Sequence, residues 1–285
     1  MGQWDAWIGR EEQRTDRIDP AMVARWCATI DRDLMDGADV PQGVHWCLCL
    51  PDAATADLGA DGHPARDEGP ASFLPPVPLP RRMWASSKVE FFKPLRLGGK
   101  VTRQSKVLSV TAKEGGSGSL VFVDVGHDTI GEEGLAVREV QSLVYRDAAG
   151  PNAPLGPPAP SESSFDPASW DAHRRLVPSE TLLFRFSALT FNSHRIHYDL
   201  PYAQDAERYR GLVVHGPLTA TLLLDLARRE LGDNALANFA FRGLSPAICG
   251  EVLHLVMRAQ TDTIELGAFA ADGRHVMAAS AIKKV

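Results

Sequence analysis

The chain of 285 residues lacks any run of the roughly 20 apolar residues that would span a bilayer. It also lacks an excess of basic residues, since 30 Lys and Arg stand against 36 Asp and Glu and give a net charge of -6. We therefore expect neither a membrane nor nucleic acid as a partner. The N-terminal stretch MGQWDAWIGREEQR has no apolar run, so no signal peptide is expected and a cytoplasmic location is predicted.

Cysteine is scarce as well. The four cysteines show no Cys-x-x-Cys spacing, which argues against a disulfide framework and against a structural zinc site. We expect them to be small buried side chains in a reducing compartment.

Proline, alanine, glycine and serine are concentrated in residues 146–167, RDAAGPNAPLGPPAPSESSFDP. Because proline fixes φ and removes a hydrogen-bond donor, this stretch predicts an exposed linker. It separates an N-terminal unit, residues 1–145, from a C-terminal unit, residues 168–285. A second irregular region, residues 52–80, interrupts the N-terminal unit and is too long for a simple turn.

The C-terminal unit begins with an apolar segment at 179–190 that we interpret as a strand. A long helix is predicted at 215–232, with Pro217 in the first turn and Gly232 as its end. Its leucines give a broad apolar surface that needs enclosure. Four strand-like segments follow, at 236–243, 251–260, 263–270 and 275–284.

The N-terminal unit offers a comparable series. A helix is predicted at 19–33, capped by Asp19, and alternating segments predict strands at 83–92, 100–112, 119–130 and 136–146. A helix with four or more antiparallel strands, found twice, indicates one central helix wrapped by a curled sheet in each unit. The predicted fold class is therefore α+β, a double hotdog.

One loop, FNSHRIHYDLPYA at 191–203, concentrates titratable side chains. Together with the preceding FSALT it resembles the signature of the R-specific enoyl-CoA hydratase, or MaoC-like, family: Gly-Asp-x-Asn-Pro-aliphatic-His-x-Asp. Phe191 and Asn192 stand in place of Gly-Asp, and His194 and Arg195 in place of Asn-Pro. The residues that match in type and spacing are Ile196, His197, Asp199 and Ala203. Residues 213–220, VVHGPLTA, resemble the start of the family's long helix.

The loop departs from the family signature at Phe191, Asn192, His194 and Arg195. With these departures, and with the segments GVHWCLCLP and FLPPVPLPRRMWA in the N-terminal unit, the chain is most similar to double-hotdog hydratases of mesaconyl- or itaconyl-type CoA thioesters, often labelled FAS1-like dehydratases. The resemblance implies a hydro-lyase that adds water across an α,β-unsaturated CoA thioester, here a short branched dicarboxylic one. It implies no cofactor and no metal. It also implies one active site per chain, because the N-terminal unit has no second His-x-Asp loop.

Hydration requires a base for the water, an acid for Cα and donors for the enolate-like oxygen. By resemblance, His197 deprotonates the water. Asn192 cannot ionise, so it either orients the water or is a turn residue. Asp199 either holds the imidazole or supplies the missing carboxylate. Gly216, at a helix N-terminus, is expected to help polarise the thioester carbonyl.

Contacts with the acyl-CoA are assigned from charge and position. The candidates are Arg82, Arg195, His215 and Leu218, with Arg81 and Lys93 as further cations for phosphates or a substrate carboxylate. His215 is expected to shape the start of the helix by hydrogen bonding, while the leucines at 218–226 form core. His194 is left open between a structural and a functional histidine.

Three alternatives remain at this point. His194, His197 and Asp199, with His215, would make a metal site, although their spacing matches no common structural zinc pattern. The chain would otherwise be a 3-hydroxyacyl-thioester dehydratase of lipid or polyketide synthesis. The absent Gly-Asp carboxylate keeps open a non-catalytic acyl-thioester-binding subunit. A homodimer is also left open.

Overall fold

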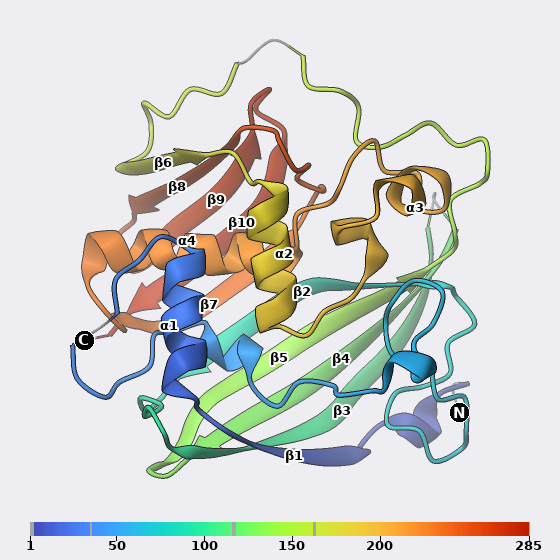
Figure 1. Ribbon diagram of the computed structural model, residues 1–285, viewed down its shortest axis with the longest axis horizontal. Helices are drawn as coiled ribbons and strands as arrows, with labels where there is room; N and C mark the ends of the chain where they lie inside the picture. The colour runs from blue at the N-terminus through green and yellow to red at the C-terminus, as the bar shows by residue number, and fades with distance from the viewer. Residues whose placement is uncertain (1–2, 35, 116–117, 162–163, 285) are drawn as a thin grey trace.

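The computed structural model describes residues 3–34, 36–115, 118–161 and 164–284 (Figure 1). Its strands are β1 (Glu11–Arg17), β2 (Arg81–Phe91), β3 (Lys100–Gly115), β4 (Gly118–Gly131), β5 (Gly134–Arg146), β6 (Ala172–Leu176), β7 (Leu236–Gly243), β8 (Leu253–Ala259), β9 (Ile264–Ala270) and β10 (His275–Lys283). The α-helices are α1 (Pro20–Thr29), α2 (Glu180–Leu189), α3 (Leu200–Asp205) and α4 (Gly216–Leu231). Short 3₁₀ turns lie at Asp5–Trp7, Val44–Cys47, Thr55–Asp57 and Arg195–His197. None of the described helices is long and apolar enough to cross a membrane.

All ten strands belong to one antiparallel sheet with the order β1-β3-β4-β5-β2-β7-β10-β9-β8-β6. The order is the same from either edge: β1-β3-β4-β5-β2 in the first half matches β6-β8-β9-β10-β7 in the second. The halves meet where β2 pairs with β7, from Ser86 opposite Arg242 to Glu90 opposite Asn238. This repetition confirms the predicted α+β double hotdog fold.

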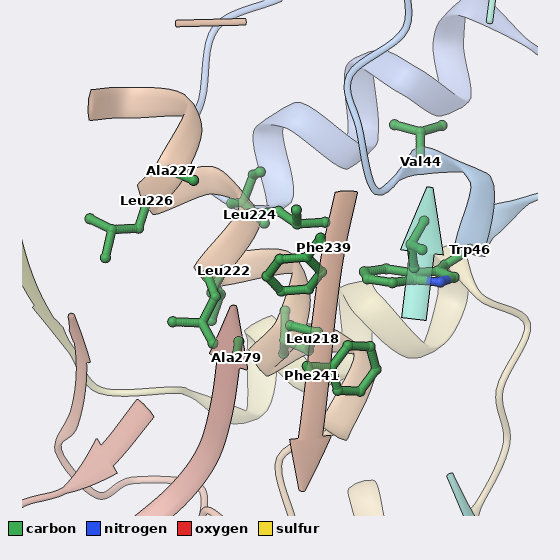
Figure 2. Packing of buried hydrophobic residues seen from close by; sticks show 14 of the residues in the cluster. Val44, Trp46, Leu218, Leu222, Leu224, Leu226, Ala227, Phe239, Phe241 and Ala279 are labelled. Atoms are coloured by element: carbon green, nitrogen blue, oxygen red, sulfur yellow. The ribbon is translucent and has the colours of Figure 1, made fainter. Parts of the chain in front are cut away.

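Helix α4 is the long helix predicted from the sequence. It runs from Gly216, with Pro217 in its first turn, to Leu231, and Gly232 ends it at φ +96°. The helix is buried from Leu218 to Arg228 and contacts β6, β8, β9 and β10. In Figure 2 Leu218 and Leu222 of this helix lie beside Phe239 and Phe241 of β7. The four strands predicted after it are all present.

The apolar segment at 179–190 forms helix α2, so its interpretation as a strand is wrong. Ser179 caps the helix by accepting a hydrogen bond from the backbone N–H of Leu182. Leu183 and Phe186 are buried while Phe184 is 70% exposed, which is the one-sided burial of a helix surface. A run rich in leucine and phenylalanine permits either interpretation.

In the described part of the chain the first half has no long wrapped helix. The expectation of one central helix in each unit is therefore wrong for the first half. The helix predicted at 19–33 is α1, which ends at Thr29. It follows β1 in the chain just as α2 follows β6, and it packs against α2. The 3₁₀ turn Val44–Cys47 follows it where α4 follows α2. Trp46 of this turn packs edge-on against Trp84 and Phe241. Figure 1 shows α4 over the second-half strands.

Asp225 connects α4 to its surroundings through ion pairs. Its carboxylate is 1% exposed and lies 2.6 Å from Arg229 of the same helix. It lies 3.0 Å from Arg174 of β6 and 3.8 Å from Arg32, which follows α1. One buried negative charge thus holds three cations from three parts of the chain.

Replacing Asp225 by Asn should lower the free energy of unfolding by about 3 kcal/mol, because three arginines lose a buried counter-charge. Urea denaturation of both proteins measures the difference. The control is Glu11→Gln, which removes an exposed ion pair with Lys106 and should change stability little. Equal effects of the two substitutions would contradict the role given to Asp225.

Candidate active site

A cavity of about 1220 Å³ lies between the concave face of the first-half strands and the start of α4. Its wall includes the loop at 190–197, the first residues of α4 and inward-facing side chains of β2 to β5. Nine of the wall residues are arginines and four are Asp or Glu, so the wall carries an excess of positive charge. Such a cavity suits a large anionic ligand.

His197 lies in the wall of this cavity and is 7% exposed. Its Nδ1 is 2.7 Å from the carbonyl oxygen of Val213, so Nδ1 carries the hydrogen and donates it. Nε2 has no partner among the described residues and keeps its lone pair. Burial lowers the pKa of His197 to about 3, against the opposing effect of the Val213 hydrogen bond. The ring is therefore neutral near pH 7.

His215 lies directly on His197, with ring centroids 3.5 Å apart and an angle of 20° between the planes. Its Nε2 is 2.8 Å from the hydroxyl of Ser187 on α2, and its backbone precedes Gly216 at the start of α4. Burial, and then the nearby His197, lower the pKa of His215 well below its ordinary value. Two stacked neutral rings thus form one side of the cavity, and the expected hydrogen-bonding role of His215 fits this contact.

Gly216 also lies in the cavity wall, where α4 directs its N-terminus. A Cβ at this residue would meet no atom within 4 Å, so the backbone is open to a ligand. The free N–H groups and the dipole of a 16-residue helix place partial positive charge here.

Asn192 lies in the wall as well, but part of its side chain has a local task. Its Oδ1 accepts a hydrogen bond of 2.9 Å from the backbone N–H of His194, which closes a turn after Phe191 at φ +47°. This is the turn role considered from the sequence. The amide nitrogen of Asn192 has no partner among the described residues.

Asp199 does not contact His197. Its Oδ1 accepts from the backbone N–H of Tyr202 and caps α3, and its Oδ2 accepts from Arg195 at 2.7 and 2.9 Å. These hydrogen bonds, that of Tyr202 first and then those of Arg195, hold the pKa of Asp199 below its ordinary value. Neither expected role of Asp199 is supported, because its carboxylate is occupied and His197 Nδ1 bonds to Val213.

Some of the predicted ligand contacts lie in the cavity wall, and others do not. Arg82 and Arg81 lie in the cavity wall, although Arg81 is paired with Glu207 at 2.5 Å. Arg195 is held by Asp199 and by the carbonyl of Ala60 and lies over the ring of Tyr202. Leu218 is fully buried in the core, so its assignment as a ligand contact is not supported. Lys93 donates to the carbonyl of Glu133 on the exposed surface.

Sequence reasoning missed Asp61 and His63, which come from the irregular region at 52–80. His63 lines the cavity beside His194, with ring centroids 4.1 Å apart. Asp61 accepts hydrogen bonds from His63 at both carboxylate oxygens, 3.0 Å from the backbone N–H and 3.0 Å from Nδ1. The signal in the sequence was Asp-Gly-His inside a region too long for a turn.

A polar cluster on the first-half strands was also missed. Glu139 of β5 accepts hydrogen bonds from Ser87 at 2.5 Å and from the indole of Trp46 at 3.2 Å, and His45 lies 3.8 Å away. Burial raises the pKa of Glu139 to about 7, against the hydrogen bonds of Ser87 and Trp46. This cluster lies on the face that α4 covers in the other half.

The metal site considered from the sequence is not assembled, because Asp199 is bound to Arg195 and His197 donates to Val213. Elsewhere in the described chain, potential donor atoms of Asp61, His63 and His194 all lie within 4.8 Å of one another. Both oxygens of Asp61 are already hydrogen-bonded to His63, which is the geometry of an Asp–His pair.

Solved structures share this architecture. A MaoC-like dehydratase from Phytophthora capsici superposes with a TM-score of 0.71 at 14% identity, over 97% of this chain and 96% of that one. HtdX of Mycobacterium tuberculosis gives 0.68 at 17% identity, over 96% and 99%. A further M. tuberculosis protein described as a double hotdog gives 0.60 at 14%, over 97% and 96%. The chain is thus of the double-hotdog class.

Sequence comparison gives the family. The model of the family described as hydroxyacyl-thioester dehydratase type 2 matches residues 43–249. The chain is 42% identical over 282 residues to a mesaconyl-C(4)-CoA hydratase of Chloroflexus aurantiacus, covering 97% of this chain and 96% of the relative. It is 35% identical over 99 residues to the mitochondrial hydroxyacyl-thioester dehydratase type 2 of Schizosaccharomyces pombe, covering 34% and 32%. The chain belongs to the hydroxyacyl-thioester dehydratase type 2 family, and the predicted kinship is confirmed.

Glu139→Gln should make the protein more stable at alkaline pH. In the unfolded chain this carboxyl ionises near its ordinary pKa of 4.5, whereas the folded protein keeps its proton up to a pKa of about 7. Between these values a rising pH favours the unfolded chain, and the lost free energy of unfolding reaches about 3 kcal/mol. The variant should gain most of this at pH 8 and little at pH 4.5.

Urea denaturation at both pH values measures the effect. Glu230→Gln, at an exposed position near the end of α4, is the matched control and should leave the pH dependence unchanged. A Glu139 variant with the same pH dependence as the original protein would show that the buried carboxyl does not retain its proton.

Proposed function

We propose that this protein is an acyl-CoA hydratase/dehydratase that adds water across an α,β-unsaturated CoA thioester and removes it in the reverse direction. The observation that carries the proposal is His197. Its ring is neutral, Val213 fixes its orientation, and its Nε2 is left without a protein partner in the wall of the cavity that also contains Gly216. A base with a free lone pair beside a helix N-terminus is what hydration of a thioester needs.

In the proposed reaction the thioester oxygen lies at the N-terminus of α4, near Gly216. Nε2 of His197 takes a proton from water while the water oxygen bonds to Cβ. The π electrons of the double bond move toward the carbonyl and form an enolate, which the helix N-terminus stabilises. A proton then adds at Cα. One water is consumed, with OH on Cβ and H on Cα. Asn192, through its free amide nitrogen, is proposed to orient the water.

For the substrate we propose a short branched dicarboxylic enoyl-CoA of the mesaconyl or itaconyl type. The excess of arginine in the cavity wall supports an anionic acyl group as well as the CoA phosphates. Arg82 has no ion-pair partner among the described residues and, after the larger effect of burial, lowers the pKa of Arg66. Two neighbouring guanidinium groups suit a phosphate. The mesaconyl-C(4)-CoA hydratase that shares 42% of its residues with this chain supports the acyl group.

For the wider context we propose a cytoplasmic enzyme that acts on free CoA thioesters. Its units would be residues 1–145 and 168–285, joined by 146–167. The second unit would supply His197 and Gly216, and the first would supply much of the cavity wall. A homodimer is compatible with this arrangement, because the proposed site uses one chain.

The proposal predicts that mesaconyl-CoA is hydrated faster than crotonyl-CoA, since only mesaconyl-CoA carries a free carboxylate on its acyl group. Incubation with a panel of enoyl-CoA thioesters, followed by mass detection of the added water, measures both rates. Equal rates would remove the dicarboxylate preference, and release of free CoA would indicate a thioesterase.

His197→Ala should lower kcat by about 1000-fold, because general base catalysis contributes on the order of 10²–10⁴ in rate. Affinity for a CoA thioester, measured by calorimetry, should change little, since the helix N-terminus and the arginines remain. His173→Ala, at the far edge strand β6, is the control. Unchanged turnover in the His197 variant would end the catalytic assignment.

A further inference from the structure

The proposed site needs a second proton-exchange group. The MaoC-like signature that the loop resembles has an aspartate where this chain has Asn192, and an asparagine cannot ionise. Asp199 is the nearest carboxylate in sequence, and its oxygens are used by Arg195 and by the N-terminus of α3. The structure brings another carboxylate to the same loop from the first half of the chain.

That carboxylate belongs to Asp61, in the turn at residues 59–63, which packs on the loop at 190–197. The backbone N–H of Arg195 donates to the carbonyl of Asp61 at 2.9 Å, and its guanidinium donates to the carbonyl of Ala60 at 2.9 Å. The hydroxyl of Ser193 donates to the carbonyl of Gly62 at 2.5 Å. Three hydrogen bonds therefore fix the turn over positions 193–195.

Gly62 makes this close approach feasible. Its φ is +85°, and a Cβ at this residue would overlap the carbonyl of Ser193. A residue with a side chain would be strained in conformation and would push the two loops apart. The docking therefore requires glycine between Asp61 and His63.

Docking places four side chains in a row. Asp61 is hydrogen-bonded to Nδ1 of His63, which leaves Nε2 of that ring without a protein partner. The ring of His63 lies 4.1 Å from that of His194, and the ring of His194 lies 5.5 Å from that of His197, at 88°. The three histidines all line the cavity.

The charges along this row differ. Burial would raise the pKa of Asp61, but the hydrogen bonds and charge of His63 outweigh it and hold the pKa below its ordinary value. Burial, followed by the charge of His63, lowers the pKa of His194 to about 3. Of the four histidines at this end of the cavity, His63 is the one with a carboxylate partner among the described residues. A positive charge on the row is thus best balanced at His63.

We propose that Asp61 and His63 are positioning residues of the hydratase site and that, through His194, they provide the carboxylate-backed proton exchange that Asn192 cannot. This inference rests on the proposed hydration. The imidazolium of His63, balanced by Asp61, passes its proton through His194 to Cα of the enolate. The proton that His197 took from water then returns to this pair, directly or through a water, and restores the starting state.

Asp61→Asn keeps the shape of the side chain and removes its charge. We expect kcat to fall by about 100-fold, at the lower end of acid–base effects, with KM little changed. The basic limb of the pH profile of kcat should move to lower pH, because the imidazolium loses its counter-charge. Arg81, His197 and His215 also face His194 and remain in the variant. Asp57→Asn, exposed in the same region, is the matched control.

An active original enzyme whose Asp61→Asn variant keeps its kcat and pH profile would contradict the inference alone. An original enzyme that hydrates no member of the thioester panel would contradict the proposed function and the inference with it. If Asp61→Asn lowers the melting temperature, its loss of activity could come from misfolding, and His63→Gln is then the deciding variant. A similar loss of kcat in His63→Gln supports the inference, and full kcat overturns it. Loss of activity with a chelator, restored by Zn²⁺ in the original enzyme only, would also overturn it.

Discussion

The pairing of β2 with β7 joins two copies of the same strand arrangement into one sheet, and the described residues form one long helix, α4, against it. Helix α4 fills the concave face of its own half and is buried along most of its length. The first half has the short turn Val44–Cys47 at the corresponding place in the chain, and four residues cannot fill the space that sixteen fill. The cavity is therefore a direct consequence of joining a complete half to one without a long helix.

This difference divides the tasks between the halves. The second half supplies a helix N-terminus and the fixed ring of His197, both of which depend on rigid secondary structure. The first half, whose strands face the cavity, carries polar side chains on the inner face of its sheet. Glu139 and His127 occupy such positions, and burial shifts the pKa of each toward the neutral form, to about 7 and about 4. The inner face of these strands thus carries polar side chains whose charged forms are disfavoured by burial.

The sequence predicted what depends on local periodicity and on one motif. Eight of the ten described strands and α4 follow from alternation, from Pro217 and from Gly232, whereas the short edge strands β1 and β6 were not predicted. The place of His197 follows from the spacing of its neighbours. Helix α2 was missed because an apolar run fits a strand as well as a helix until burial on one side is known. Asp61 could not be assigned to the site, since the hydrogen bond from Ser193 to Gly62 joins residues 131 positions apart. Tertiary docking of that kind leaves no local pattern.

In the proposed site, burial and the contact between two rings set how strongly His197 and His215 bind a proton. Protonating His197 or His215 alone would place a charge in a poorly solvated cavity against a neighbouring ring 3.5 Å away, so the resting rings stay neutral. A bound thioester that develops negative charge on its oxygen changes this balance, because an imidazolium near an enolate is stabilised. In the proposed reaction the basicity of His197 is thus low before the oxygen gains charge and rises as the enolate forms. An interaction that strengthens toward the transition state is the kind that increases the rate.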